Sequence, residues 1–165
     1  MKKHWLKSIA VASLVAVASA NASAEVMSAV VANGHAWLVD APLPISGMAT
    51  AAFLHPGGQL VATYSAECSV AAPENPAFSD RGVVDVYIVV QNTQGQQVAT
   101  LAPSGEYSAF CSSVGSPGKF SSPATFSTTG VGTLPRGTYR VVVRGGLNEE
   151  RASGWMGPRS LVVMR

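Results

Sequence analysis

Polar and apolar residues alternate along residues 58–70, GQLVATYSAECSV. Successive side chains of a β-strand point to opposite faces of a sheet, so a period of two predicts a strand with one face in a core. The turn formers Pro56-Gly57-Gly58 precede the segment, and Ala72-Pro73 follows it. The face expected in the core carries Leu60, Ala62, Tyr64, Ala66, Cys68 and Val70.

The segment 83–91, VVDVYIVVQ, is apolar on both faces except for Asp85. A strand that is apolar on both faces is typical of the middle of a sheet, where neighbouring elements cover it on both sides. Residues 92–95 supply turn formers, and residues 97–101 are expected to pair back onto the strand as a hairpin.

Weaker patterns predict further strands, and stretches rich in Gly, Pro and Ser predict the loops between them. Asn33-Gly34 lies between two apolar runs and indicates a hairpin; a flexible N-terminus followed by one strand near Trp37 explains the same pattern. Pro42 and Pro44 cannot donate to a sheet and mark a connection or an edge. The expected strands are 49–54, 107–111, 124–129, 138–144 and 159–164, and the expected loops are 72–82, 112–123 and 145–158.

Eight or nine short strands without a convincing helix predict an all-β fold. Regular spacing of strands and turns favours a single antiparallel β-sandwich of about eight strands, of jelly-roll or immunoglobulin-like type.

Residues 1–24 have the three-part layout of a secretory signal peptide. Lys2, Lys3 and Lys7 precede the uncharged apolar run 8–20, and small residues up to Ala24 follow it. An apolar run of thirteen residues is too short to span a membrane as an uncleaved anchor. We therefore expect a signal peptide at 1–24, a β-sandwich domain at 25–165, and export to the periplasm or the cell exterior without a membrane span after cleavage.

Removal of the leader changes the net charge. The chain has 11 Lys and Arg against 9 Asp and Glu, a net charge of +2. Three of the basic residues lie in the leader, which leaves eight basic against nine acidic residues, or −1. The mature domain therefore lacks the positive charge that binding to nucleic acid or to an anionic membrane requires.

Cys68 and Cys111 are the two cysteines of the chain. Pairs of cysteines persist as disulfides in the oxidising environment outside the cytoplasm, so one bridge is expected. Thiols this far apart, without a histidine pattern nearby, support neither a metal site nor a catalytic thiol.

Candidate catalytic groups are few. His35 and His55 both lie at turns, where we expect them to be solvated, and no Gly-x-Ser-x-Gly motif accompanies them. Glu67 and Asp85 are the carboxylates inside strong strand patterns, and on neighbouring strands they would suit a glycosidase if they faced one pocket; Asp85 is also a candidate partner for Arg140 or Arg144. The chain has no spacing typical of a metal site and no phosphate-binding loop. We expect no enzyme activity, no cofactor and no metal.

The stretch 145–158, GGLNEERASGWMGP, is the candidate contact surface, because recognition residues often lie on loops that a rigid sandwich holds. An exposed Trp beside mixed charges would stack on a sugar ring or enter a pocket of a protein partner. The alternative is that Trp155 and Met156 fold back and close the open end of the sandwich. The candidate contact residues are Trp155, Arg151, Glu149 and Glu150.

Five patterned segments carry a resemblance to known proteins: YSAECSV, VDVYIVV, AFC, LPRGTYRVVVR and SLVV. Together they resemble small exported bacterial β-sandwich proteins of unknown function, with a strand pattern similar to jelly-roll domains of the C1q/TNF type. The resemblance covers residues 48–164 and implies a fold but no catalytic residue. The Gly-Thr-Tyr strand is also similar to the end of secreted pilin-like and spore-coat-type subunits, although here a further strand follows.

These observations favour an exported, non-enzymatic binding module whose partner is an unknown protein or glycan. The alternatives are a structural subunit of a cell-surface assembly and, third, a carbohydrate-active enzyme.

Overall fold

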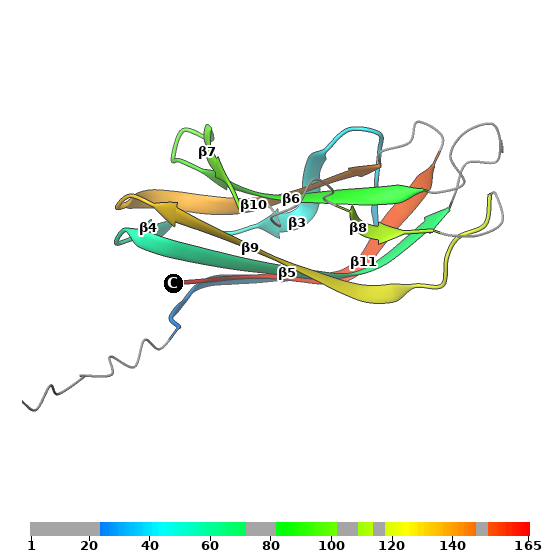
Figure 1. Cartoon of the computed structure of the whole chain (residues 1–165), viewed down its shortest axis with the longest axis horizontal. Coiled ribbons are helices and arrows are strands. Elements are labelled where there is room, and N and C mark those ends of the chain that lie inside the picture. The colour runs from blue at the N-terminus through cyan, green and yellow to red at the C-terminus, as the bar shows by residue number, and fades with distance from the viewer. Residues whose placement is uncertain (1–23, 72–81, 102–108, 114–117, 148–151) are drawn as a thin grey trace, which may run out of the picture.

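The computed structural model describes five segments of the chain: 24–71, 82–101, 109–113, 118–147 and 152–165. These residues form eleven β-strands and no helix. The strands build two antiparallel sheets that lie face to face (Figure 1), which confirms the all-β sandwich. Residues 1–23, nearly all of the expected signal peptide, lie outside the described residues.

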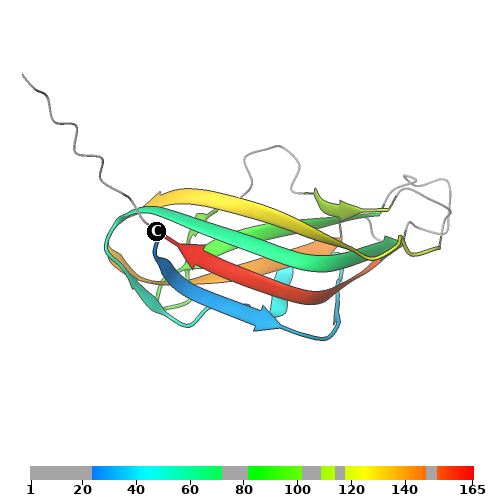
Figure 2. The same cartoon turned by 90° about the horizontal axis from the view of Figure 1, so that it is seen from below.

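Four strand positions make up the first sheet, and Figure 2 shows them side by side. Two short strands share the first position, because both pair with the last strand of the chain. The order across the sheet is β1 and β2, then β11, β5 and β9. Its strands are β1 (Val26–Ala32), β2 (Ala36–Trp37), β5 (Gly58–Ala71), β9 (Ala124–Leu134) and β11 (Ser153–Met164).

The second sheet also has four positions, in the order β3 and β4, β10, β6, then β7 and β8. The eleven described strands therefore fill eight positions, close to the number expected. β6 has neighbours on both sides, as its two apolar faces predict. The strands are β3 (Leu43–Ala49), β4 (Phe53–His55), β6 (Val83–Gln91), β7 (Gln97–Thr100), β8 (Ala109–Ser112) and β10 (Gly137–Leu147).

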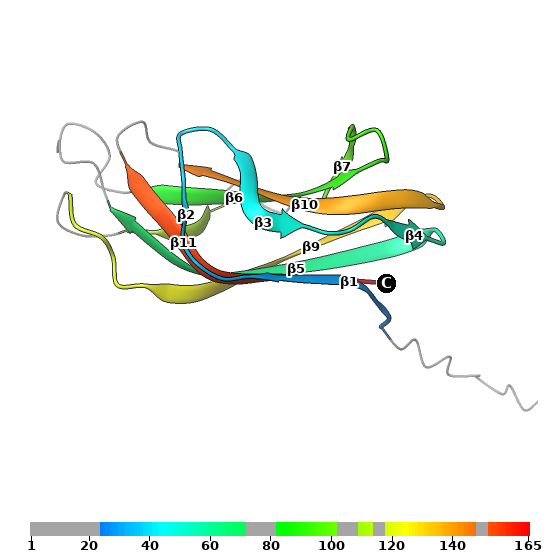
Figure 3. The ribbon, with the colours of Figure 1, turned by 180° about the vertical axis from the view of Figure 1, so that it is seen from behind.

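The strand pairs are nested. β1 pairs with β11, β3 and β4 with β10, β5 with β9, and β6 with β7 and β8. The chain is thus one long hairpin with its tip between β6 and β7, rolled so that β11 also pairs with β5 and β10 with β6. The start of β1 consequently lies beside the C-terminus (Figure 3), where Glu25 and Arg165 exchange two backbone hydrogen bonds and form an ion pair.

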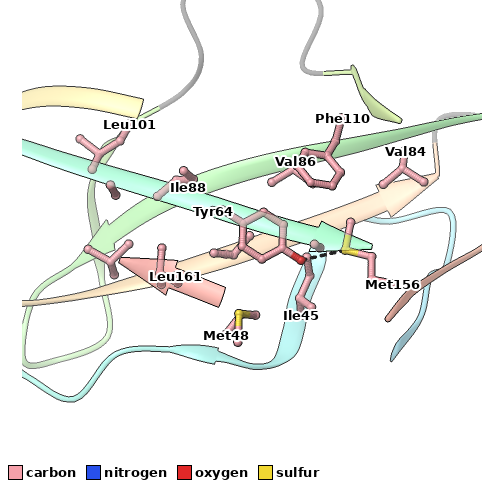
Figure 4. Packing of buried hydrophobic residues seen from close by; sticks show 14 of the residues in the cluster. Ile45, Met48, Tyr64, Val84, Val86, Ile88, Leu101, Phe110, Met156 and Leu161 are labelled. Atoms are coloured by element: carbon pink, nitrogen blue, oxygen red, sulfur yellow. Dashed lines mark hydrogen bonds between the residues drawn. The ribbon is translucent and has the colours of Figure 1, made fainter. Parts of the chain in front are cut away.

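The hydrophobic core lies between the two sheets. All six residues expected on the inner face of β5 are buried, so the alternation of that segment is confirmed. Tyr64 is the largest of them, and its hydroxyl donates a hydrogen bond of 2.9 Å to the sulfur of Met156 on β11 (Figure 4). Burial raises the pKa of the Tyr64 hydroxyl well above its usual value, although the positive charge of Arg159 opposes the shift.

The N-terminal strands follow neither expected arrangement. They do not form a hairpin, and two strands are present instead of one strand near Trp37. β1 and β2 lie one after the other along the same edge of β11: Ala32 is opposite Arg159, and Ala36 is opposite Met156. The three residues 33–35 on this edge therefore match two residues on β11, 157 and 158. Gly34, with φ of 85°, forms the kink that absorbs the extra residue.

The prediction of a loop at residues 145–158 is wrong for the part of this stretch that the structure describes. Gly145 to Leu147 belong to β10, and Ser153 to Pro158 belong to β11. Glycine indicates a loop because it is rare in strands, but here close packing requires it. A Cβ atom on Gly146 would lie within 3 Å of the backbone of Ala41 and Pro42. These glycines are therefore needed for close packing against segments that are distant in the sequence, and they do not mark a loop.

A disulfide joins Cys68 on β5 to Cys111 on β8, as the sequence predicts. Both cysteines are buried, and their Cα atoms are 6.4 Å apart. Because β5 belongs to the first sheet and β8 to the second, the bridge links the two layers covalently.

We expect the double substitution Cys68→Ala and Cys111→Ala to lower the free energy of unfolding by about 2–5 kcal/mol, because the unfolded chain regains the entropy of an open loop. Denaturant unfolding of the oxidised wild type and the double variant measures the difference. An unchanged midpoint would show that the bridge does not constrain the unfolded chain.

Stability should also fall above pH 10 because of Tyr64. The unfolded chain releases this phenolic proton near pH 10, whereas the folded protein retains it, so rising pH favours the unfolded state. The contribution is about 1.4 kcal/mol per pH unit. Unfolding measured from about pH 9 to about pH 12 should show a steeper loss for the wild type than for Tyr64→Phe. Equal slopes for the two proteins would contradict a buried, neutral Tyr64.

Candidate functional site

Four aromatic side chains meet on the outer side of the first sheet, and we call them the aromatic patch: His35, Trp37, Phe120 and Trp155. Trp37 on β2 and Trp155 on β11 are direct cross-strand partners. Their neighbours Ala36 and Met156 are buried in the core, so both Trp side chains leave the sheet on its outer face.

Edge contacts join the rings of the patch in two pairs. The rings of His35 and Trp155 are 4.7 Å apart at an interplanar angle of 85°, and those of Trp37 and Phe120 are 6.3 Å apart at 68°. Edge-to-face contact is a favoured arrangement of aromatic pairs. Trp37 remains 70 % exposed and Phe120 45 % exposed, while Trp155 is half-buried. The exposed part of the patch is therefore made mainly by the rings of Trp37 and Phe120, which contact each other.

Hydrogen bonds to β5 hold the segment that carries Phe120. Ser121 donates its backbone NH to the carbonyl of Val70, and its own carbonyl accepts a bond of 2.7 Å from the Ser69 hydroxyl. Ser69 is 1 % exposed although it belongs to the outer face of its strand, directly opposite Trp155. The patch therefore rests on a backbone that is tied to the sheet.

A bulge in β11 lies directly after Trp155 and Met156. Between Met156 and Arg159 the pairing with β5 gains one residue, at Gly157-Pro158. A Cβ atom on Gly157 would overlap the carboxylate of Glu67 and lie 3.1 Å from the ring of Trp155, so both side chains lie close over this glycine. Glu67 is consequently the acidic group beside the patch.

Arg159 follows the bulge and is buried, with only 6 % of its surface exposed. Its guanidinium donates hydrogen bonds to three backbone carbonyls: that of Ser46 at 2.7 and 3.1 Å, and those of Gly34 and Gly157, each at 2.9 Å. The three carbonyls belong to β3, to the kink before β2, and to the bulge. Arg159 thus fixes the turn that carries His35 and the strand that carries Trp155.

A small groove of about 220 Å3 opens beside Trp37, at the edge where the two sheets meet. Its lining is mainly apolar and includes Leu38, Leu43 and Ile45. A wider hollow of about 490 Å3 lies beside the turn after β6, with Thr50, Gln94 and Arg140 in its wall. No acidic residue or histidine lines either one.

The carboxylates considered for catalysis do not meet. Glu67 lies on the outer face of β5 in the first sheet, and Asp85 on the outer face of β6 in the second. The hydrophobic core separates them, so they cannot form a glycosidase pair. Arg140 bonds Gln91 rather than Asp85, and Arg144 is paired in register with Tyr87. Among the described residues the one ion pair joins Arg165 to Glu25.

His35 and His55 differ in their surroundings. His35 is exposed in the patch, as expected. His55 is fully buried, so the expectation that it is solvated is wrong; its Nε2 contacts the carbonyl of Gly58 at 3.3 Å, and its ring packs edge-on to Tyr139. In the part of the chain that the structure describes, no three His, Cys, Asp or Glu side chains gather as a metal site.

Sequence reasoning found one member of the patch and missed the others. Trp155 was expected on a loop or folded over the end of the sandwich, and instead it lies on β11. The other expected contact residues, Glu149, Glu150 and Arg151, lie outside the described residues. Trp37 is marked by the structure and not by a sequence pattern: it follows the buried Ala36 in a two-residue strand, and it is 70 % exposed.

No protein-family model matches the chain, and no curated protein matches its sequence. Solved structures of infectious bursal disease virus show a distant similarity. The Gx strain structure aligns with a TM-score of 0.45 and 10 % identity over 87 % of this chain and 32 % of the viral chain. For the Gt strain the values are 0.38, 12 %, 86 % and 31 %. The chain thus spans about a third of the viral chains, and similarity at this level says nothing about what it binds.

None of the described residues belongs to a helix that is long and apolar enough to cross a membrane.

The two Trp residues of the patch should differ in their effect on stability. Trp155→Ala removes an indole ring of which about half is buried, and it should lower the free energy of unfolding by about 2–3 kcal/mol. Trp37→Ala removes an exposed ring and should change it by less than about 0.5 kcal/mol. Denaturant unfolding of both variants checks the contrast. A large loss for Trp37→Ala would mean that the ring supports the fold.

Proposed function

We propose that this protein is an exported, non-enzymatic binding module that contacts its partner, a protein or a glycan, through the aromatic patch. The observation that carries the proposal is the exposed Trp37-Phe120 pair, which is fixed on a sheet and open to solvent. An exposed indole on a rigid backbone loses little entropy when it is covered, and such residues often dominate binding energy.

The surroundings of the patch suit recognition rather than catalysis. Glu67 and the exposed imidazole of His35 supply polar groups at the rim, and the groove beside Trp37 supplies an apolar recess. Rings with polar neighbours fit either a sugar ring or a side chain of a protein partner. The cysteine bridge between the sheets agrees with an oxidising compartment.

We also propose that the sandwich is a jelly roll of the kind that the C1q/TNF resemblance implies. The nested pairs favour it over an immunoglobulin-like arrangement, because the last strand lies between the first strand and β5 instead of beside the strand before it. Jelly-roll domains include lectins, so the arrangement is compatible with a glycan-binding module.

The proposal is tested by site-specific photo-crosslinking in the native cell envelope. A photoreactive residue at position 37 should capture the partner, and the same residue at Leu54, which is 60 % exposed on the second sheet, should not. A protein partner gives a defined additional mass that proteases remove, whereas a glycan partner gives a mass that glycosidases remove. With the captured partner in hand, Trp37→Ala should weaken binding by about 2 kcal/mol or more, roughly 30-fold.

Equal capture from positions 37 and 54 would overturn the patch as the contact surface. Full affinity in Trp37→Ala would do the same, because this substitution is expected to leave the fold intact.

A further inference from the structure

The outer edge of β9 differs from the other edges of the sandwich. β9 pairs with β5 through eleven consecutive partners without a bulge, from Ala124 opposite Cys68 to Leu134 opposite Gly58. Its sequence, ATFSTTGVGTL, has no charged residue and no proline. Among the described strands, none pairs with its other side.

Each remaining edge carries a feature that discourages pairing with another chain. The β1 edge has a register shift near Val26 and is interrupted at the Gly34 kink. β3 contains Pro44, a left-handed Gly47 and a register shift against β10. β7 and β8 have only four residues each. Natural sheets protect free edges with prolines, bulges, charges or short strands, so the long, regular and uncharged edge of β9 is the exception.

We propose that β9 is a self-association edge, at which two copies of this chain pair antiparallel across a two-fold axis and join their first sheets into one.

The outer side chains of β9 favour a second copy as the occupant. Four of the five are hydroxylated, and all are exposed: Thr125, Ser127, Thr129, Val131 and Thr133. Two of them already form hydroxyl-to-hydroxyl bonds with β5, each of 3.0 Å: Thr129 with Thr63, and Ser127 with Ser65. A hydroxyl can donate once and accept twice, so each can bond a further hydroxyl on the open side.

An antiparallel pair centred on Thr129 is self-complementary. It sets Thr125 opposite Thr133 of the other copy, Ser127 opposite Val131, and Thr129 opposite its own equivalent. Hydroxylated and β-branched pairs of this kind stabilise neighbouring strands, and no like charges meet. The contact is the same patch on both copies, so it closes at a dimer.

The pairing also bears on the aromatic patch, although it does not depend on it. A two-fold axis perpendicular to the joined sheet leaves both outer faces on the same side. Two patches would then face one surface, and a dimer would bind a repetitive partner more strongly than either copy alone.

Sedimentation of the full exported chain from about 1 μM to about 1 mM tests the proposal, because an edge contact of this size is expected to be weak. The wild type should pass from monomer to dimer and stop there. Thr129→Lys and Thr129→Glu should each raise the dissociation constant of the dimer by at least about tenfold, since like charges then meet at the two-fold axis. Ser160→Lys on β11, on the same outer face but two strands from the edge, is the matched control and should behave as the wild type.

Mixing Thr129→Lys with Thr129→Glu should restore the dimer, as a mixed pair, because opposite charges then face each other. This result requires that residue 129 meets its own equivalent. A wild type that stays monomeric throughout, growth beyond a dimer, equal effects of Thr129→Lys and Ser160→Lys, or a mixture that stays monomeric would each overturn the proposal. Binding through Trp37 is measured separately, so its outcome leaves this one unaffected.

Discussion

The bulge in β11 is the constraint on which both faces of the first sheet depend. Strand side chains alternate strictly, so a shift of one residue moves every later side chain to the other face. Before the bulge Met156 points into the core and Trp155 points out; after it Arg159, Leu161 and Val163 point in. Without the extra residue at Gly157-Pro158, one half of β11 would expose its apolar residues.

Arg159 shows how the fold compensates for that interruption. A bulge, a kink and an edge strand leave carbonyls that the regular pairing of the sheet does not satisfy. The guanidinium offers five donors in a fixed plane, which is enough to reach the carbonyls of Ser46, Gly34 and Gly157 together. A buried charge is costly, but three carbonyl dipoles replace much of the water that it loses. One guanidinium therefore ties together three stretches of backbone beneath the aromatic patch.

The rolled hairpin brings distant segments together at that surface. β2 from the N-terminal part, β11 from the C-terminal part, and residues 120–121 from the middle of the chain all contribute to the patch. The same roll leaves β9 at the opposite edge of the first sheet from β1 and β2 (Figure 2). One sheet thus carries the aromatic patch on its outer face, and at β9 an edge that no other described strand pairs with.

The sequence alone determined the elements whose evidence is local. The alternation of residues 58–70 predicts which side chains of β5 are buried. The double apolar face of residues 83–91 predicts a central strand, and two cysteines in a chain that is expected to be exported predict the bridge. In each case the period of the side chains or the identity of a residue carries the information.

Tertiary structure decided the rest. Gly145, Gly146 and Gly154 indicate a loop until the neighbours that exclude a Cβ atom are in place. Trp37 and Trp155 are 118 positions apart in the sequence and meet only because the chain rolls back on itself. Arg159 is charged, as many surface residues are, and it is buried because three carbonyls from separate segments converge on it. Local patterns report how each segment would pack against any core, but a site built from three distant segments exists only once those segments meet.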